Sequence, residues 1–288
     1  MNRSPRVAAV HDISGYGRCS LTVALPVLAA MGAQCCPLPT AYLSAQTAFP
    51  KSDQAVFLDM TDQMVRTGRH WAELGLEFDA IYSGFLGSDV QVGLLGDFIR
   101  RFRRKETLVL VDPVMGDWGR PYRTCTPDLC RRMGELAAHA DVITPNLTEA
   151  AILLGEDYDP TPGTDRQKAW LERLSLNGTR SVVLTGVSPA AGLVGAACFD
   201  RETGEISFPS AKQEPGNYSG TGDLFASVML GGLLRGEQLR AAAGRSVEFV
   251  QKCAAYTNAR QGAEVEGVRF EALLGELLRP SIPTAGKH

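Results

Sequence analysis

Short apolar runs rich in β-branched residues alternate along this chain with longer amphipathic stretches, and this alternation constrains the fold more than any other feature. Several of the short runs are apolar at nearly every position, which is typical of parallel strands covered on both faces. The chain therefore predicts βαβ units and an α/β fold, in which helices flank both faces of a mostly parallel central sheet. The predicted strands are Val7–Val10, Gln34–Pro37, Ala80–Ser83, Thr107–Val111, Val142–Thr144, Ser181–Leu184 and Leu193–Phe199.

Patterns with helical spacing fill the intervals between these strands, and the rhythm changes once, after residue 193. There, Leu193–Asp200 and Glu205–Phe208 flank a Thr203-Gly204 turn. This pattern is typical of a hairpin and predicts an antiparallel edge on the sheet. The predicted helices are Leu21–Met31, Thr61–Leu74, Asp89–Phe102, Pro127–His139, Thr148–Leu154, Gln167–Leu174, Leu224–Leu234 and Leu239–Gln261.

Charge and composition bear on the domain organisation and on the partners. The 288 residues contain no linker rich in Pro, Gly and Ser and no internal repeat, so we expect one domain over residues 1–288, with its core at 6–278 and a loosely held tail. With 29 Lys and Arg against 32 Asp and Glu, the net charge is −3, which gives no electrostatic reason to expect nucleic acid or a membrane as a partner. No signal peptide or continuous apolar helix of about twenty residues is visible, and we expect a cytoplasmic protein.

The cysteines favour a reducing environment. They occur without a CxxC pair and without a histidine at ligand spacing. Their odd number argues against a disulfide framework, and their spacing argues against a structural zinc site. We expect reduced and mostly buried thiols at all seven positions, which are Cys19, Cys35, Cys36, Cys125, Cys130, Cys198 and Cys253.

The segment Ser219-Gly220-Thr221-Gly222-Asp223 lies where a predicted helix begins. Its two glycines let backbone N–H groups converge at the positive end of a helix, where they can hold an anion or a transferring phosphoryl group. Asp223, at the edge of this segment, can accept a proton from an attacking hydroxyl. Taken alone, an Asp at this position is more often only a helix cap.

Two further strand ends carry acids and an amide, and ligands of open α/β sheets bind beyond such strand ends. Asp112 and Asp117 lie on one loop, where two carboxylates suit a hydrated divalent cation of the kind that accompanies nucleotide phosphates. A turn held by its own Asp side chains is the alternative. In the next segment, Asn146 can hold a phosphate oxygen or a metal-bound water, and Glu149 can bind the ion through water, while Thr148 can cap the helix.

The remaining strand ends are less specific. Thr185, followed by a glycine, suits the close approach of a phosphate or ribose. The loop that begins at His11 is too polar for a simple connection, although His11 alone is more often structural and Ser14 alone a turn residue. The chain lacks the GxxxxGK[ST], GxGxxG, GxSxG and HExxH motifs, which disfavours a P-loop NTPase, a dinucleotide-binding protein, an α/β-hydrolase and a zinc metalloprotease.

Together, three of these segments resemble the ribokinase-like superfamily and its vitamin kinases. Residues 219–223 are similar to the GTGD anion-hole signature, residues 112–117 to the DPVxGD motif, and residues 144–150 to the TPNxxEA motif. They occur in the family's order and spacing. Within the superfamily, the chain most resembles the pyridoxal/pyridoxamine kinases, because residues 43–49 are similar to the segment that faces the pyridine ring and residues 82–86 to a TGY segment, with Phe85 in place of Tyr.

The resemblance implies ATP-dependent phosphorylation of the 5′-hydroxymethyl group of pyridoxal, pyridoxamine or pyridoxine, in salvage of pyridoxal 5′-phosphate. ATP and Mg²⁺ are the implied cofactors, with a monovalent cation left open, and the implied assembly is a homodimer. The resemblance also assigns roles. Asp223 would be the catalytic base, with Gly220, Thr221 and Gly222 as the anion hole, His11, Ser14, Gln46, Thr47 and Phe85 as substrate contacts, Asp112, Asn146 and Thr185 as ATP contacts, and Asp117 and Glu149 as metal contacts.

Two alternatives stay open. The opening residues His11–Arg18 depart from the SHVxxG pattern of pyridoxal kinases and are also similar to the TDPSGGAG loop of hydroxymethylpyrimidine kinases, so a hydroxymethylpyrimidine (phosphate) kinase of thiamine synthesis is the first. The second is a non-catalytic regulatory protein that binds a vitamer. Asp223 argues against it, because binding alone needs no base.

Overall fold

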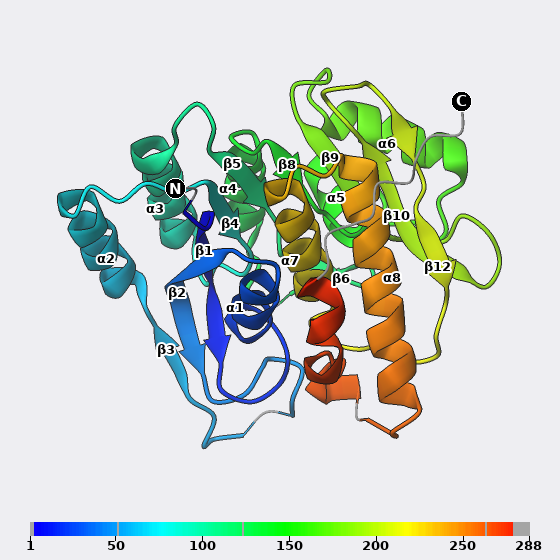
Figure 1. Ribbon diagram of the computed structural model, residues 1–288, viewed down its shortest axis with the longest axis horizontal. Helices are drawn as coiled ribbons and strands as arrows, with labels where there is room; N and C mark the ends of the chain where they lie inside the picture. The colour runs from blue at the N-terminus through cyan, green and yellow to red at the C-terminus, as the bar shows by residue number, and fades with distance from the viewer. Residues whose placement is uncertain (1–2, 51, 123, 263, 279–288) are drawn as a thin grey trace.

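The computed structural model describes residues 3–50, 52–122, 124–262 and 264–278, and within these ranges a ten-stranded sheet forms the middle layer (Figure 1). A separate two-stranded hairpin lies beside it. The strands are β1 (Arg6–Ser14), β2 (Gln34–Leu43), β3 (Phe57–Asp59), β4 (Ala80–Ser83), β5 (Leu108–Val111), β6 (Gly116–Asp117), β7 (Arg120–Pro121), β8 (Val142–Ile143), β9 (Ser181–Val187), β10 (Leu193–Phe199), β11 (Ile206–Ser207) and β12 (Ser210–Lys212).

The sheet is parallel in its middle and antiparallel at both edges. Its order is β11-β10-β9-β8-β5-β4-β1-β2-β3, and β12 also pairs with β10. The six strands from β9 to β2 in this order run parallel to their neighbours. At one edge β10 runs antiparallel to β9, β11 and β12, and at the other β3 runs antiparallel to β2. The predicted fold class and the antiparallel edge are confirmed.

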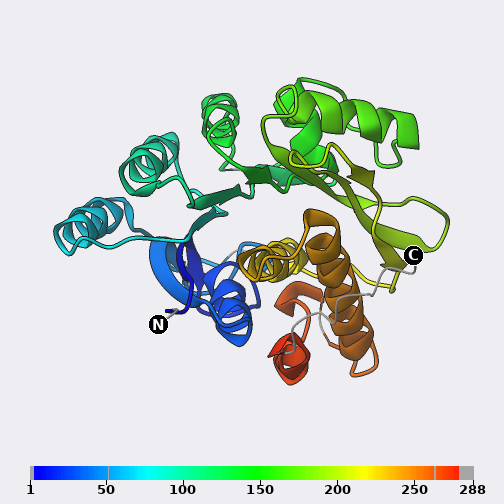
Figure 2. The same ribbon diagram turned by 45° about the horizontal axis from the view of Figure 1, so that its top comes forward.

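Helices cover both faces of the sheet (Figure 2). The helices α2 to α6 pack on one face, and α1, α7 and α8 pack on the other. Successive residues of β4 point to opposite layers, since Ile81 joins the first core whereas Ala80 and Tyr82 join the second, and all three are fully buried. This arrangement explains why the strands are apolar without alternation. The helices are α1 (Leu21–Ala30), α2 (Thr61–Glu73), α3 (Asp89–Phe102), α4 (Pro127–Ala137), α5 (Leu147–Leu154), α6 (Thr164–Leu174), α7 (Thr221–Leu234) and α8 (Leu239–Asn258).

The sequence did not predict several short elements. Strand β3 is exposed at all three positions, so it carries no pattern of a half-buried strand. The β6–β7 hairpin has only two residues in each strand, which is too short for a strand pattern, so the sequence predicted a loop there. After α8, the chain continues into the 3₁₀ segments η1 (Glu264–Glu266) and η2 (Glu271–Leu278). The tail that we expect to be loosely held begins at residue 279 and lies outside the described residues.

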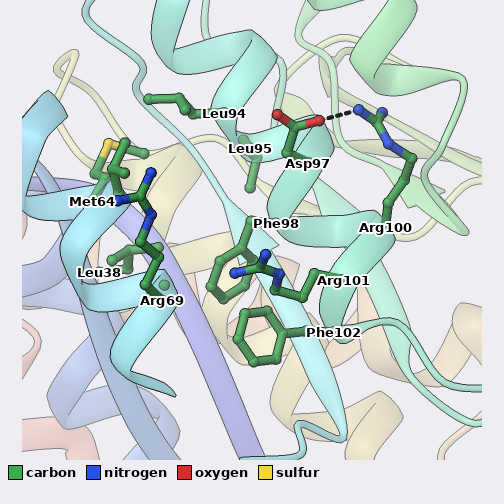
Figure 3. A pocket seen from close by; sticks show the side chains of 12 residues that line it. Leu38, Met64, Arg69, Leu94, Leu95, Asp97, Phe98, Arg100, Arg101 and Phe102 are labelled. Carbon is green, nitrogen blue, oxygen red and sulfur yellow. Dashed lines mark hydrogen bonds and ion pairs between the residues drawn. The ribbon is translucent and has the colours of Figure 1, made fainter. Parts of the chain in front are cut away.

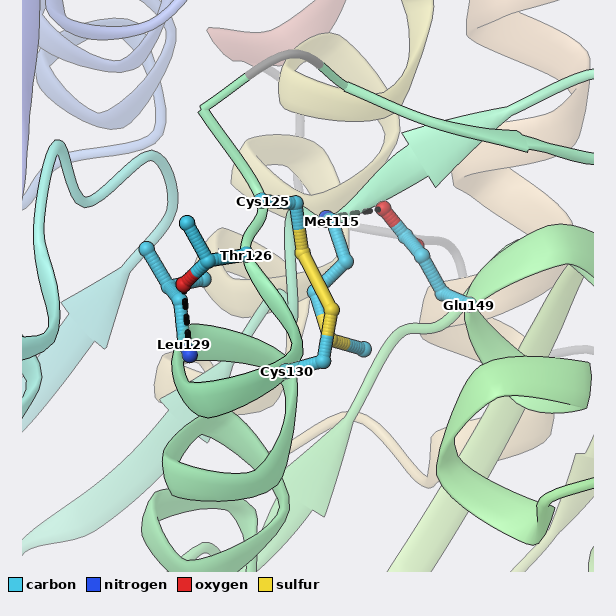
Figure 4. The surroundings of a disulfide bond; sticks show 6 residues. All are labelled: Met115, Cys125, Thr126, Leu129, Cys130 and Glu149. Atoms are coloured by element: carbon cyan, nitrogen blue, oxygen red, sulfur yellow. Dashed lines mark hydrogen bonds between the residues drawn. A yellow bond between two sulfur atoms is a disulfide. The ribbon is translucent and has the colours of Figure 1, made fainter.

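Cys125 and Cys130 form a disulfide, with their Cα atoms 6.2 Å apart (Figure 4). The expectation that every thiol is reduced is therefore wrong for this pair. Cys125 precedes α4 and Cys130 lies in it. Thr126 caps this helix, because its Oγ1 accepts a hydrogen bond from the N–H of Leu129 at 3.2 Å, and the first turn of α4 brings the two cysteine side chains together. Their separation of five residues did not by itself indicate a disulfide. The free cysteines are Cys19, Cys35, Cys36, Cys198 and Cys253.

Helix length and hydropathy bear on the predicted absence of a membrane span. Among the helices of the described ranges, none combines the length and the apolar character needed to cross a membrane.

Candidate active site

The carboxyl ends of the central parallel strands lie side by side because their hydrogen bonding continues past the strand ends. The N–H of Gly84, after β4, bonds the carbonyl of Val10 on β1 at 3.1 Å. The N–H of Asp112, after β5, bonds the carbonyl of Ser83 on β4 at 2.9 Å, and the N–H of Thr144, after β8, continues the row at β5. The polar residues that follow these strands are therefore placed along one edge of the sheet.

The N-terminus of α7 opens at this edge and is formed by glycine. Gly220 is the N-cap, with φ of 73°, and a Cβ on it would lie 1.9 Å from the carbonyl oxygen of Arg18, so only glycine fits. The first intrahelical bond runs from the N–H of Leu224 to the carbonyl of Gly220 at 3.0 Å. The N–H groups of Thr221, Gly222 and Asp223 precede this bond and have no intrahelical acceptor. We call residues 219–223 the phosphate cradle.

Asp223 lies in the first turn of α7 but does not cap this helix. The cap position is Gly220, and the Asp223 carboxylate reaches back to the start of α1, where its Oδ2 accepts a hydrogen bond from the N–H of Ser20 at 2.8 Å. Its Oδ1 lies 3.9 Å from Nδ1 of His11, and its side chain is 15% exposed. Burial, with a smaller contribution from the negative charge of Asp12, raises the pKa of Asp223 to about 7. A carboxylate with this pKa can accept a proton near neutral pH.

The raised pKa of Asp223 predicts a pH-dependent rate. If Asp223 must be ionised to act, kcat measured at saturating substrate should fall about tenfold for each pH unit below about 7 and level off above it. Stability should show the opposite trend, because the folded state retains a proton that the unfolded chain, with its ordinary value of 3.8, loses. The contribution of Asp223 to the free energy of unfolding should therefore decline as pH rises from about 4 to 7. A kcat profile without a limb near pH 7 would contradict this prediction.

Asp12 is a site residue that the sequence analysis missed. Strand β1 extends to Ser14, four residues beyond its predicted end, and it carries Asp12 into the buried edge. The two carboxylate oxygens of Asp12 accept hydrogen bonds from the hydroxyls of Ser20, at 2.5 Å, and Ser14, at 3.0 Å. Burial raises the pKa of Asp12. A polar residue at the end of an apolar strand was the available signal, but its pairing with Ser20 is a tertiary contact.

Asp112 and Glu149 form the acidic floor of the site. Asp112 is 8% exposed, and burial together with the charge of Asp223 raises its pKa to about 8. The two oxygens of Glu149 accept hydrogen bonds from the backbone N–H groups of Met115, at 3.1 Å, and Asn146, at 2.8 Å (Figure 4 shows the first). Burial, and then the charge of Asp112, raises the pKa of Glu149 well above its usual range. So much buried negative charge favours either protons or a bound cation.

Asn146 is the cap of α5, and the expectation that Thr148 caps this helix is wrong. The Oδ1 of Asn146 accepts hydrogen bonds from the N–H groups of Thr148, at 2.8 Å, and Glu149, at 2.9 Å, which completes a capping box. Its Nδ2 donates to the carbonyl of Gly116 at 2.9 Å. The hydroxyl of Thr148 instead accepts a hydrogen bond from the N–H of Gly119 at 2.9 Å. These bonds fasten the β6–β7 hairpin to the start of α5.

The predicted nucleotide and metal contacts flank this capped helix. Thr185 on β9 forms an isolated parallel β-bridge with Asn146, and the N–H of Thr185 donates to the carbonyl of Pro145 at 2.9 Å. Asp117 is exposed in the β6–β7 hairpin, where its Oδ1 accepts a hydrogen bond from the N–H of Trp118 at 2.8 Å. Within the described ranges, no three His, Cys, Asp or Glu side chains are close enough to hold a metal ion by themselves. A divalent ion here would need ligands from phosphate and water, which Mg²⁺ commonly retains.

The predicted substrate contacts lie on β1, which carries His11 and Ser14, and in the loops after β2 and β4, which carry Gln46, Thr47 and Phe85. Ser14 is buried and donates to Asp12, as described above. Gln46 is buried, and its Nε2 donates to the carbonyl of Val265. Thr47 lies exposed in a turn, whereas Phe85 is half-buried and its carbonyl accepts a hydrogen bond from the hydroxyl of Thr40 at 2.9 Å.

The segment η1 fastens these loops together, a role that the sequence analysis also missed. The carbonyl of Glu266 accepts a hydrogen bond from the N–H of Arg18 at 3.0 Å, and its carboxylate accepts one from the hydroxyl of Tyr16 at 2.9 Å. The carbonyl of Glu264 accepts from the N–H of Ser219 at 3.3 Å. A chain segment 250 residues from Tyr16 therefore connects the loop after β1 to the phosphate cradle.

A hollow of about 500 Å³ lies elsewhere, between α2 and α3 (Figure 3). Its walls include Phe98 and Phe102, and Arg100 pairs with Asp97 at its rim. None of the predicted site residues lines it. We assign the site to the carboxyl edge instead, because the acids, the exposed helix N–H groups and the strand ends converge there.

A buried carboxylate beside a glycine-bounded helix N-terminus, at the carboxyl edge of a parallel sheet, is consistent with the ribokinase-like class of small-molecule kinases. The chain belongs within this class to the phosphomethylpyrimidine kinase family, which matches residues 25–268, and it is a kinase.

Its relatives carry two kinds of name. It is 29% identical over 273 residues to the pyridoxine/pyridoxal/pyridoxamine kinase of Bordetella avium, covering 90% of this chain and 88% of that one. It is 39% identical to a Bacteroides thetaiotaomicron protein, described as a candidate phosphomethylpyrimidine kinase, whose crystal structure with pyridoxal superposes with a TM-score of 0.90 and covers 98% of both chains. The pyridoxal kinase of Lactobacillus plantarum is 32% identical, with a TM-score of 0.87 and coverage of 96% and 97%.

Proposed function

We propose that this kinase transfers the terminal phosphoryl group of ATP to the 5′-hydroxymethyl group of a vitamin B6 vitamer, in salvage of pyridoxal 5′-phosphate. The observation that carries the proposal is the position of Asp223, held by the N–H of Ser20 beside the N–H groups of Thr221, Gly222 and Asp223, which have no intrahelical acceptor. The names of the relatives, and the pyridoxal bound by the Bacteroides protein, support the choice of substrate.

In the proposed reaction, the ionised Asp223 accepts the proton of the 5′-hydroxyl as that oxygen attacks the terminal phosphorus. A new phosphorus–oxygen bond forms, the bond to the bridging oxygen of ATP breaks, and ADP leaves with the electron pair. The N–H groups of Thr221, Gly222 and Asp223 stabilise the negative charge on the transferring group. Asp112, Asn146 and Thr185 are the proposed contacts to the polyphosphate.

Mg²⁺ suits the acidic floor of this site. Burial is the main cause that raises the pKa values of Asp112, Asp223 and Glu149, and neighbouring carboxylates raise them further, so a cation that offsets their charge would be favoured here. Asp117 and Glu149 are the residues proposed to hold the ion, through water in the case of Glu149, because both of its oxygens already accept backbone hydrogen bonds. When bound, the ion neutralises charge on the phosphates. A requirement for a monovalent cation stays open.

The proposed vitamer pocket lies between the end of β1 and the loops after β2 and β4, with Ser14, Gln46, Thr47 and Phe85 as its contacts, whereas His11 is fully buried beside Asp223. Segment η1 closes one side of it through Gln46 and the loop after β1. The pocket therefore borders Asp223 through β1, which also carries His11 and Ser14.

A substrate panel tests the proposal. We expect kcat/KM for pyridoxal, pyridoxamine or pyridoxine to exceed that for hydroxymethylpyrimidine by about a hundredfold, because the pyrimidine lacks the ring hydroxyl of the vitamers and a buried polar partner would be left unpaired. ADP release measured for all four compounds under identical conditions gives the ratio. A preference for the pyrimidine would reject the vitamer assignment while leaving the kinase chemistry intact.

The second candidate is a hydroxymethylpyrimidine kinase of thiamine synthesis. The family match and the similarity of residues 11–18 to the loop of those enzymes favour it. A regulatory protein that only binds a vitamer is the third, and the same panel separates it, because saturable binding without ADP release would be its signature.

We also propose that the chain forms one domain over residues 1–288 and assembles as a homodimer. An exposed apolar patch on the β2–β3 edge supports a dimer, since Tyr42, Val56, Phe57 and Leu58 are each at least 41% exposed there. Exposed apolar residues grouped on an unpaired strand edge are typical of an interface. Sedimentation equilibrium measures the mass directly, and a monomer at micromolar concentration would contradict the proposal. The cytoplasmic location stays a prediction.

A further inference from the structure

The imidazole of His11 lies behind the Asp223 carboxylate and is fully buried. Its exposed fraction is 0%, and its Nδ1 is 3.9 Å from Oδ1 of Asp223. Neither ring nitrogen has a hydrogen-bond partner among the described residues. Buried polar atoms are nearly always paired, so two orphaned nitrogens next to the proposed base require an explanation.

The neighbouring strand is shaped to hold this ring. Tyr82 on β4 meets the imidazole edge-on, with the ring centroids 4.2 Å apart. Gly84, just beyond β4, has no side chain, and a Cβ there would lie 2.3 Å from Nδ1 of His11. The ring therefore occupies space that any other residue at position 84 would fill. Two strands together fix the imidazole against Asp223.

The charge state of His11 limits what it can do there. Burial lowers its pKa to about 3, so the ring is neutral at physiological pH and carries one N–H. The acceptor that faces Nδ1 is the Asp223 carboxylate, which favours the tautomer with the proton on Nδ1. A separation of 3.9 Å is longer than a hydrogen bond, and such contacts at active sites commonly shorten when substrate binds.

We propose that His11 is a positioning residue for the catalytic base, in which the Nδ1–H of the imidazole and the N–H of Ser20 hold the two oxygens of the Asp223 carboxylate and aim it at the acceptor hydroxyl. This inference rests on the proposed role of Asp223. It goes beyond that role because it assigns to His11 an action on the base in place of a contact with the vitamer.

Other groups face Asp223, and none of them replaces the imidazole. Among the described residues, neither Asp12 nor Asp112 makes a hydrogen bond to the Asp223 carboxylate, and the hydroxyl of Tyr82 lies 3.5 Å from the backbone carbonyl of Asp223, not from its carboxylate. His11 is therefore placed to donate a hydrogen bond to Oδ1 of Asp223, as the N–H of Ser20 does to Oδ2. The titratable groups with a charge interaction at Asp223 are Asp12, Cys19, Tyr82, Asp112 and Tyr122.

Paired substitutions test the inference. His11→Leu removes the N–H and should lower kcat by about tenfold to a hundredfold, the scale of a misplaced reactive group, with the KM for ATP unchanged. His11→Asn places an amide N–H near the position of Nδ1 and should recover kcat to within about threefold of the original protein. Equal losses in both variants would overturn the inference. Thermal melting and ADP binding confirm that each variant is folded.

Gly84→Ala provides an independent route to the same effect. Its added methyl group should displace the imidazole from Asp223 and reproduce the kcat loss of His11→Leu, while the KM for ATP again stays constant. Unchanged kcat in a folded Gly84→Ala protein would count against the inference.

A double-substitution cycle separates this inference from the assignment of the base. If His11 acts through Asp223, His11→Leu should cost almost nothing further once Asp223→Asn is present. If Asp223→Asn alone retains full turnover, the proposed base is wrong whatever His11 does. If Asp223→Asn is impaired and His11→Leu costs the same factor in both backgrounds, the base stands and the role of His11 falls.

The tautomer gives a direct spectroscopic readout. The chain has only four histidines, so ¹⁵N-histidine labelling yields few signals, and the His11→Asn spectrum identifies the one from His11. We expect a neutral imidazole protonated on Nδ1 from pH 5 to 8, with a shift that changes in Asp223→Asn. A proton on Nε2, or titration within this range, would overturn the proposed contact.

Discussion

Replacing Asp223 with Asn is expected to lower kcat by about a hundredfold or more, the usual contribution of a positioned general base. The amide has nearly the shape of the carboxylate, and its oxygen can still accept the hydrogen bond from the N–H of Ser20. The phosphate cradle keeps its geometry because its cap is Gly220, not Asp223. The substitution therefore removes the proton acceptor and little else, and the affinity for ATP should change only modestly.

Steady-state ADP release gives kcat, and titration of the protein with ADP gives the nucleotide affinity. Asp128→Asn is a matched control, since Asp128 also lies in the first turn of a helix, α4, but its side chain is 82% exposed. That variant should retain its turnover. Normal turnover in Asp223→Asn would reject Asp223 as the base, and a loss confined to nucleotide affinity would assign it to binding.

The sequence predicted the fold well where local pattern and tertiary environment agree. Strand β4 and helix α3 begin and end at the predicted residues, because apolar runs and helical spacing end there at polar or turn residues. Strand β1 runs four residues past its predicted end, because pairing with β2 keeps the polar residues up to Ser14 in the sheet. The local pattern cannot show pairing of this kind.

The candidate site was predictable to the extent that its residues follow strands. Asp112, Asn146 and Asp223 were found because strand ends and helix starts are visible in the pattern, and parallel strands bring them to one edge. The buried carboxylate of Asp12 and the contacts of Glu266 with the loop after β1 were not found. These contacts join segments up to 250 residues apart, and no spacing rule connects such segments.

The cap of α5 shows how two local signals compete. Thr148 and Asn146 are both residues that favour caps, and the sequence analysis chose Thr148. The structure uses Asn146 because Glu149, three residues later, completes a capping box with it. The capping box occupies one oxygen of Glu149 and the N–H of Met115 occupies the other, so its predicted metal contact remains a prediction that acts through water.

Alanine substitutions at the two glycines of the phosphate cradle should lower kcat at both positions but change stability in different directions. In Gly220→Ala, the new Cβ would meet the carbonyl oxygen of Arg18 at 1.9 Å, and φ of 73° is strained for alanine. The free energy of unfolding should fall by about 2 kcal/mol or more, and the cradle should open because Arg18 must move. We expect kcat to drop by about a hundredfold, the scale for losing one donor to a transition-state anion.

Gly222→Ala is the companion variant that separates the fold from the chemistry. A Cβ at Gly222 meets no atom within 4 Å, and alanine is favoured over glycine inside a helix by about 1 kcal/mol. Its melting temperature should therefore stay the same or rise. Its kcat should still fall about tenfold or more, because the methyl group would occupy space that the transferring phosphoryl group needs beside the N–H donors. A stable Gly222→Ala protein with full turnover would show that the phosphoryl group is held elsewhere, and the kinase site would have to be sought away from the start of α7.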